Sequence, residues 1–305
     1  MLNVGSMRNK GLEITLDAVP VRTRHFEWNM NFNIAFNRNT ILALNENQYS
    51  LFSRLSWNMD YNSQYPYISQ VGKSTGLMYG YLYEGTYKEE DFNNGMSLKT
   101  GIPYLSNIGK ENIRPGDPKY KDINGDGVIE DNDRTVIGRG QPIHTGGFTN
   151  TFNFYGFDLN IFFQWCYGND VLNANRYVFE AGWKSELNQY TSYSNHYDTV
   201  KNPDSDIPRI RAKGMNVYSQ RVIEDGSYLR LKNITLGYTL PNRLLRKLYF
   251  DTMRVYVSLE NVYTWTNYSG VDPEVSTRNS VLTPGFDWSA YPRAFSVTGG
   301  ISFTF

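Results

Sequence analysis

The chain has 305 residues, with 30 Lys and Arg against 30 Asp and Glu, so its formal net charge is zero. A nucleic-acid-binding protein needs a basic excess to displace counterions from phosphate, and we therefore expect no nucleic-acid partner. Aromatic residues are unusually frequent, at 24 Tyr, 17 Phe and 6 Trp, yet the mean hydropathy is −0.52. No stretch approaches the roughly 18 consecutive apolar residues of a transmembrane helix.

The chain lacks the usual signatures of an enzyme. Its single cysteine, Cys166, allows neither an internal disulfide nor a cysteine-based metal site. The three histidines, His25, His144 and His196, lie far apart in the sequence. Neither a Gly-x-Ser-x-Gly motif nor a glycine-rich phosphate loop occurs. We therefore predict no enzymatic activity. The first ten residues do not resemble a signal peptide, so we expect a cytosolic protein or part of a longer chain.

Strict alternation of apolar and polar residues predicts β-strands with one apolar face. In residues 26–37 every even position is apolar, from Phe26 to Phe36, whereas the odd positions hold Asn, Glu or Ala. The same alternation occurs in residues 12–18, 157–165, 253–259 and 295–305. The sequence therefore predicts an all-β, antiparallel fold.

Further strands are less regular. In residues 148–154, three phenylalanines share a face with Asn150. In residues 228–240 the apolar phase slips near Lys232 and Asn233, which predicts a β-bulge. Any further strands are expected before residue 143, with residues 76–87 as the best candidate. The total is about six to eight strands.

The connections between these strands alternate in length. Tyr155 and Gly156 join two strands tightly and residues 241–251 form a modest connection, whereas residues 168–226 and 263–293 are long. Short turns on one side and long loops on the other are typical of an outer-membrane β-barrel. The alternative is a soluble antiparallel sandwich with one solvated face. Strand lengths of about 9–11 residues match a tilted bilayer crossing and favour the transmembrane barrel.

The aromatic residues have an expected place in such a barrel. Trp28, Trp165, Tyr167, Tyr263 and Trp265 lie near predicted strand ends and would form aromatic girdles. We expect the aromatic excess in girdles and loops rather than in a core. Aromatic residues also close the chain: Phe303 and Phe305 are in the apolar phase of the last strand and are the candidate signal for the barrel assembly machinery.

Residues 122–133 match the register of an EF-hand-like calcium loop. Oxygen donors fall at loop positions 1, 3, 5, 9 and 12, with a glycine at position 6 and an apolar residue at position 8. Position 12 is the shorter Asp133 rather than Glu, and helix-forming flanks are missing. The alternative is a turn rich in Asp and Asn without metal. The candidate Ca²⁺ ligands are Asp122, Asn124, Asp126, Asp133 and the backbone carbonyl of Val128.

Several segments together resemble the C-terminal part of the SusC/RagA-type TonB-linked outer-membrane proteins of Bacteroidetes. The matches follow the family order along almost the whole chain, at residues 3–13, 26–37, 115–133, 146–152, 226–238, 259–266 and 291–305. The resemblance implies that residues 1–305 are the C-terminal strands of a 22-stranded barrel whose plug domain is absent from this chain. It places the protein in the cell outer membrane, in contact with lipids.

The resemblance also implies a function and partners. It implies TonB-dependent import of nutrient oligomers, either glycans or peptides, under a SusD-type surface lipoprotein, with TonB acting through a part of the protein missing here. Two alternatives remain open: a complete small barrel of eight strands, and a soluble calcium-dependent carbohydrate-binding β-domain. Six aromatic residues in the long loops either contact cargo or partner, or only pack the loops, which we favour: Trp183, Tyr190, Tyr193, Tyr197, Trp288 and Tyr291.

Overall fold

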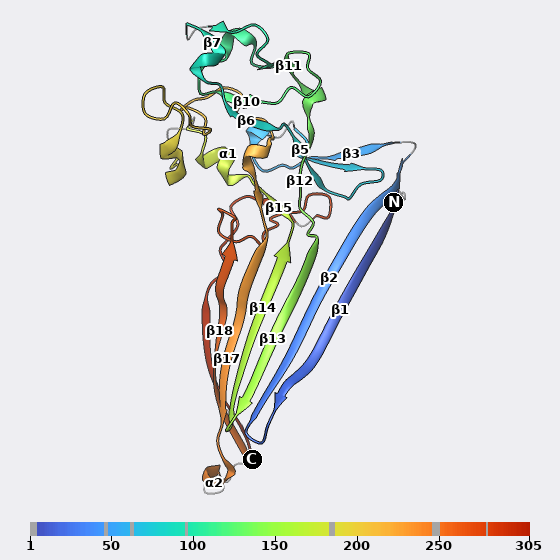
Figure 1. Ribbon diagram of the computed structural model, residues 1–305, viewed down its shortest axis with the longest axis vertical. Helices are drawn as coiled ribbons and strands as arrows, with labels where there is room; N and C mark the ends of the chain where they lie inside the picture. Colours follow the sequence, from blue (N-terminus) through green and yellow to red (C-terminus); the bar gives the residue numbers. More distant parts are fainter. Residues whose placement is uncertain are drawn as a thin grey trace.

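The computed structural model describes residues 5–45, 48–61, 64–94, 97–182, 187–245, 251–278 and 280–305. A tall antiparallel sheet and a cap of small sheets stacked at one end of it make up these residues (Figure 1). None of the helices in these ranges is both long and apolar enough to cross a membrane.

The tall sheet, called here the main sheet, contains seven strands within the described residues. Their spatial order follows the sequence, and each pairs antiparallel with its neighbours. The sheet is open, with the first and last strands at its edges, and the predicted all-β antiparallel class is confirmed. In order, the strands are β1 (Gly5–Arg22), β2 (Phe26–Leu44), β13 (His144–Phe154), β14 (Phe157–Tyr167), β17 (Tyr228–Thr239), β18 (Thr252–Thr266) and β20 (Ser296–Thr304).

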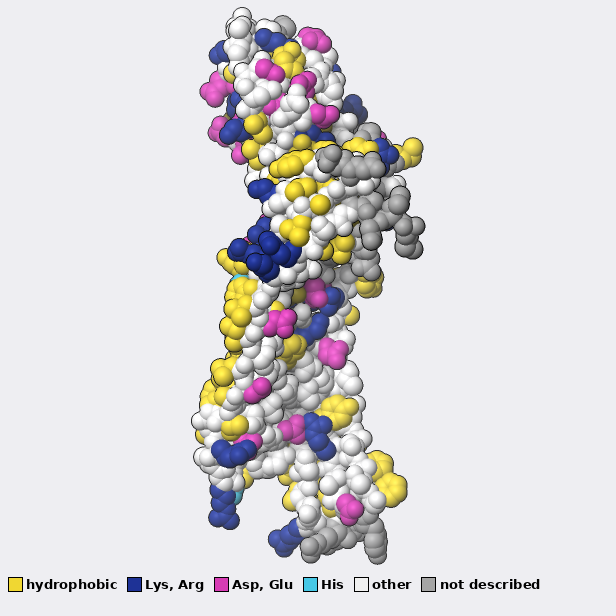
Figure 2. All heavy atoms as spheres, turned by 90° about the vertical axis from the view of Figure 1, so that its right-hand side faces the viewer, with side chains coloured by type: hydrophobic (Ala, Val, Ile, Leu, Met, Phe, Trp, Pro, Cys, Tyr) yellow, Lys and Arg dark blue, Asp and Glu magenta, His cyan; other side chains and the backbone are white. Residues whose placement is uncertain are grey.

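The register aligns the apolar phases of all these strands on one face of the main sheet, because side chains alternate between faces along a strand. Leu16 of β1 lies opposite Phe32 of β2, which in turn lies opposite Phe148 of β13. This face, called here the apolar face, is exposed: Leu12 is 58% and Ile301 59% accessible. Figure 2 shows hydrophobic side chains along one margin of the sheet region and charged side chains over the cap.

All short connections lie at one end of the main sheet and all long excursions at the other. Tyr155 and Gly156, with φ of 48° and 87°, form the tight turn between β13 and β14, and residues 23–25 join β1 to β2. Residues 45–143, 168–227 and 267–295 all leave and re-enter at the opposite end. The predicted alternation of short turns and long loops is therefore confirmed.

The predicted β-bulge is present. The pairing of β17 shifts register between Leu231 and Asn233 against β18, and opposite it between Phe162 and Phe163 of β14. Leu229 and Leu231 lie on the apolar face before the bulge, at odd positions in the sequence. Because the bulge inserts one extra residue, Ile234 and Leu236 lie on the same face after it, at even positions.

The cap is built from the three long excursions. A four-stranded sheet contains β12 (Thr135–Arg139), β5 (Leu77–Gly80), β4 (Tyr67–Gln70) and β3 (Ser50–Ser53). A three-stranded sheet contains β16 (Ile223–Asp225), β15 (Asp170–Asn173) and β19 (Phe286–Asp287). Three strand pairs complete the cap sheets: β6 (Tyr83–Thr86) with β10 (Pro118–Tyr120), β9 (Tyr104–Leu105) with β11 (Val128–Ile129), and β7 (Phe92–Asn93) with β8 (Ser97–Leu98).

Helices are few and short in the described residues. Helix α1 (Asn175–Phe179) belongs to the cap, whereas α2 (Asn242–Leu245) lies in the connection between β17 and β18. Short 3₁₀ turns occupy the cap segments Met59–Tyr61, Glu89–Asp91, Lys110–Asn112, Asp131–Asp133, Thr191–Asn195 and Gln220–Val222.

The buried core of the described residues lies in the cap and is rich in tyrosine. Its largest cluster contains Tyr61, Tyr67, Tyr177 and Tyr218, packed with Phe286 and aliphatic side chains. The expectation that the aromatic excess avoids a core is therefore wrong. A tyrosine can enter such a core because its hydroxyl finds a partner.

Four buried tyrosines of the cap, two of them from this cluster, donate their hydroxyls to backbone carbonyls of other cap segments. The pairs are Tyr61 with Met215, Tyr67 with Pro284, Tyr87 with Pro103 and Tyr120 with Gly214, at 2.6–3.0 Å.

The suggestion of an additional barrel strand at residues 76–87 is also wrong. This segment forms β5 and β6, which belong to two different cap sheets. A barrel strand leaves alternate side chains on an exposed face, whereas Met78 and Tyr81, which differ in parity, are both buried in the cap.

Candidate functional site

The second face of the main sheet, called here the polar face, carries mutually paired polar side chains. Arg254 of β18 forms a two-point ion pair with Asp158 of β14, at 2.9 and 2.5 Å. Asn160 donates to the hydroxyl of Thr151, and Asn233 donates to that of Ser258, both at 2.9 Å. Such a face fits contact with water, in contrast to the opposite apolar face.

Near the cap, the polar face carries a buried charge network. Arg230 of β17 is 2% exposed, and its guanidinium donates to Asp272 at 2.6 Å and to Glu274 at 3.0 Å. Thr264 accepts a third bond from Arg230 Nε, and Arg293 contacts both carboxylates. The network thereby fastens the excursion 267–295 over the polar face. Sequence patterns do not predict this network, because its other members are at least 34 residues from Arg230.

The cap contains a polar pocket of about 660 Å³ between α1, the segment around Thr191 and the segment around Ser269. Arg176 bridges Glu180, at 2.8 Å, and Glu224, at 3.3 Å. Burial disfavours the charged form of Arg176, but the two carboxylates outweigh it and leave its pKa raised. The exposed edge of the pocket includes Tyr190. The arrangement offers hydrogen-bonding groups to a polar ligand.

The predicted loop aromatics fall into two groups. Tyr193 and Tyr197 are buried, and Trp288 packs its ring 4.8 Å from that of Trp57, so these residues pack the cap. Tyr190 is 40% and Tyr291 91% exposed, which leaves both available for contacts. Trp183 lies outside the described residues.

The predicted girdle residues separate into the two ends of the apolar face. Trp165, Tyr167, Tyr263 and Trp265 lie at the end near the cap, where β14 and β18 finish. Trp28 lies near the short turns, and its indole Nε1 donates to Asn150 at 3.1 Å. This bond satisfies an asparagine that the register places on the apolar face.

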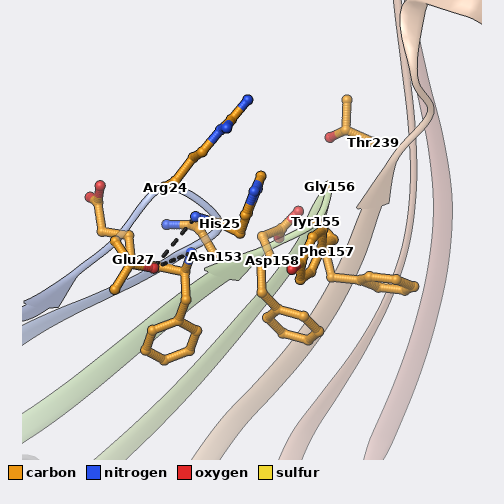
Figure 3. A pocket seen from close by; sticks show the side chains of 12 residues that line it. Arg24, His25, Glu27, Asn153, Tyr155, Gly156, Phe157, Asp158 and Thr239 are labelled. Atoms are coloured by element: carbon orange, nitrogen blue, oxygen red, sulfur yellow. Dashed lines mark hydrogen bonds between the residues drawn. The ribbon is translucent and has the colours of Figure 1, made fainter.

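A second pocket, of about 450 Å³, lies among the short turns (Figure 3). His25 stacks on Tyr155 with 4.9 Å between ring centroids, and Figure 3 shows Arg24 extending away from the sheet. The lining carboxylates of Glu27 and Asp158 are paired with Arg22 and Arg254. The histidine here has an aromatic partner rather than a carboxylate, and the pocket offers no arrangement for acid–base chemistry.

The structure brings the predicted calcium-loop residues into one loop. Asp122 accepts the N–H groups of Gly125 and Gly127, both at 2.7 Å, and these glycines have φ of 78° and 86°. Asp126 accepts from Val128 and Asn124. Ile129, the expected apolar anchor, is fully buried beside Leu105 and Tyr120.

The carboxylate of Asp133, at the end of this loop, accepts hydrogen bonds from backbone N–H groups. Asp133 is fully buried; its Oδ1 accepts from Ile123 at 2.8 Å and its Oδ2 from Glu130 at 2.9 Å. In the described part of the chain, no three Asp, Glu, His or Cys side chains gather as a metal-binding group. A hard cation would therefore depend also on the Asn124 amide and the Val128 carbonyl, a donor set that suits Ca²⁺ chemically. The calcium site stays a prediction.

The candidate assembly residues lie at the end of the last strand. Phe303 of β20 pairs opposite Met253 on the apolar face, and Phe305, beyond the strand, is 85% exposed. Their two rings are 6.4 Å apart. Their role as an assembly signal stays a prediction.

Comparison with known proteins shows which proteins the chain is similar to. The chain is 31% identical to TonB-dependent receptor P3 of Formosa agariphila over 308 aligned positions, which cover 99% of this chain and 29% of the relative. It is 25% identical to TonB-dependent receptor SusC of Bacteroides thetaiotaomicron over 99% of this chain and 27% of SusC. The chain is a homologue of the TonB-dependent receptors. This relation confirms the resemblance stated above.

The structural comparison agrees with the sequence relation. The structure of the RagAB peptide transporter matches the fold with a TM-score of 0.74 at 23% identity, over 99% of this chain and 30% of that chain. No protein-family model matches the chain. The chain spans about three tenths of the length of the curated TonB-dependent receptors it matches. These relatives are receptors and transporters by name, which is compatible with the expectation that the chain is not an enzyme.

Proposed function

We propose that this chain is part of a TonB-dependent importer of the outer membrane that takes up nutrient oligomers, either glycans or peptides. The observation that carries the proposal is the two-faced main sheet: an exposed apolar face suits lipid, and a paired polar face suits a wet lumen. Homology to TonB-dependent receptors over 99% of the chain supports the same role.

The placement of the cap supports a surface role within this proposal. Long loops of outer-membrane barrels face the cell exterior and short turns the periplasm. The cap then lies outside the cell, where its polar pocket around Arg176 meets cargo or a SusD-type lipoprotein. Similarity to the RagAB peptide transporter favours peptides as the first cargo to test.

Uptake by cells tests the proposal. Cells that make the protein carrying this chain receive fluorescent peptide or glycan oligomers, with a strain lacking TonB as the control. We expect outer-membrane fractionation of the protein and accumulation of one oligomer class only when TonB is present. Equal accumulation without TonB, or recovery of the protein in the soluble fraction, contradicts the proposal.

The two-faced sheet disfavours the soluble carbohydrate-binding alternative, since water would then cover the apolar face. The complete eight-stranded barrel predicts closure of the sheet, whereas the described residues form an open sheet of seven strands.

We further propose that the loop at residues 122–133 binds Ca²⁺ to fix the cap. Calorimetric titration with CaCl₂ tests this, with Asp133→Asn as the variant and Asp131→Asn as an in-loop control, since Asp131 is not among the predicted ligands. We expect heat from the wild type and the control and none from Asp133→Asn. Absence of heat from the wild type at millimolar calcium contradicts the calcium site.

A further inference from the structure

At the end of the apolar face nearest the cap, basic side chains occupy the positions where apolar residues would otherwise follow. Lys10 of β1 lies directly opposite Arg38 of β2, and the next pair toward the sheet centre on this face is Leu12 with Phe36. Arg8, two residues before Lys10, lies on the same face. Figure 2 shows Lys and Arg side chains gathered at the level where the main sheet meets the cap.

These three side chains have no partner among the described residues. All are exposed, and neither an ion pair nor a hydrogen bond engages their side chains in that part of the chain. Like charges directly opposite on neighbouring strands repel each other. Other arginines of the main sheet are paired, as Arg254 is with Asp158 and Arg230 with Asp272. Among the described residues, the arrangement therefore lacks the negative charge that would stabilise it.

A fourth cation borders the same place from the cap. Arg139, the last residue of β12, lines a pocket of about 350 Å³ together with Arg38. Asp170 accepts the backbone N–H of Arg139 at 2.8 Å. The guanidinium Nε of Arg139 donates to the backbone carbonyl of Gln141 at 3.2 Å, and no ion pair of this guanidinium occurs among the described residues. We call Arg8, Lys10, Arg38 and Arg139 the basic patch.

We propose that the basic patch binds the phosphate headgroup of a membrane lipid whose acyl chains lie along the apolar face. The inference rests on the membrane position proposed above. Guanidinium groups match phosphate oxygens in a two-point geometry. Basic residues at the edge of a membrane-facing surface attract anionic headgroups. A phosphate between Lys10 and Arg38 relieves their repulsion, and Leu12 and Phe36 continue the contact into the acyl region.

Lipid binding by the protein that carries this chain tests the proposal. The protein is placed in phosphatidylcholine nanodiscs, and binding of a fluorescent phosphatidylglycerol and of lipid A is titrated in each variant. The double variant Lys10→Gln/Arg38→Gln should weaken binding about thirtyfold, because two headgroup contacts are removed. The matched control Arg24→Gln/Arg243→Gln removes the same charge at the exposed short-turn end and should leave binding unchanged.

Two further measurements distinguish loss of lipid binding from loss of folding, and a lipid site from a site for free phosphate. Lys10→Glu replaces repulsion with an opposite-charge pair to Arg38, so it should fold at least as well as wild type and still lose lipid binding. Inorganic phosphate is titrated as a competitor, and competition at the affinity of the lipid would show a site for free phosphate and overturn the proposal. Equal lipid binding by wild type and both variants also overturns it. Failure of the wild type to enter nanodiscs contradicts the proposed membrane position instead.

Discussion

Arg230 and Asp272 are joined at 2.6 Å across 42 residues of sequence, and both side chains are almost fully buried. One belongs to the main sheet and the other to an excursion of the cap. The pair therefore couples the position of a surface loop to a strand of the main sheet.

Loss of this pair should destabilise the protein strongly. Asp272→Asn leaves the buried charge of Arg230 undercompensated, which should lower the free energy of unfolding by about 3 kcal/mol. Urea unfolding in detergent micelles measures the change. Arg22→Gln, which breaks the exposed pair with Glu27, is the control and should change stability little. Equal effects of the two variants would contradict a structural role for the network.

The bond between Trp28 and Asn150 should show coupling. Trp28→Phe leaves the Asn150 carbonyl oxygen without its donor on the apolar face, at a cost of about 1–3 kcal/mol. Trp28→Phe with Asn150→Leu removes both polar groups and should recover most of the stability. A double-mutant cycle of unfolding free energies measures the coupling, and additive effects would contradict it.

The contact between β5 and the segment after Met215 should not tolerate a side chain at Gly80. An added Cβ there overlaps the carbonyl oxygen of Tyr218, which accepts the N–H of Tyr81 at 2.9 Å. We expect Gly80→Ala to cost about 1–3 kcal/mol and to speed hydrogen exchange at the Tyr81 amide. At Gly299 the nearest atom lies 3.9 Å from the added Cβ, so Gly299→Ala should leave exchange in the cap unchanged.

Asp117 should make the cap less stable as pH rises. Burial raises the pKa of this carboxyl, although Arg209 and the N–H groups of Lys213 and Arg114 oppose the shift. The folded state therefore binds the proton more tightly than the unfolded state, and stability falls as pH rises from about 4 through the folded pKa. The stability difference between wild type and Asp117→Asn should shrink over this range in urea unfolding. A difference that grows with pH would show that the ion pair with Arg209 outweighs burial.

The main sheet was largely predictable because its information is local. Alternation at residues 26–37 identifies β2, and the phase slip near Asn233 identifies the bulge. Strands β1 and β2 extend further than predicted, since Arg8, Lys10 and Arg38 occupy apolar-phase positions and end the alternation early.

The cap was not predictable, because its strands are short and their partners are distant. Leu172 pairs in parallel with Phe286, and Tyr81 bridges to Ser219. Two to five residues carry too little periodicity to identify a strand. The pattern of the candidate calcium loop could be recognised because its candidate ligands lie within the contiguous residues 122–133. The basic patch depends on the pairing of β1 with β2, which the sequence does not show directly.

The hydrogen bonds from buried tyrosine hydroxyls to backbone carbonyls in the cap have a consequence for sequence variation among relatives. Tyr61, Tyr67, Tyr87 and Tyr120 each hold a main-chain carbonyl, which every amino acid supplies. These hydrogen bonds therefore place no demand of their own on the side chains of the residues that provide the carbonyls. Surface loops anchored in this way can acquire new outward side chains, and with them new ligand preferences, at little structural cost.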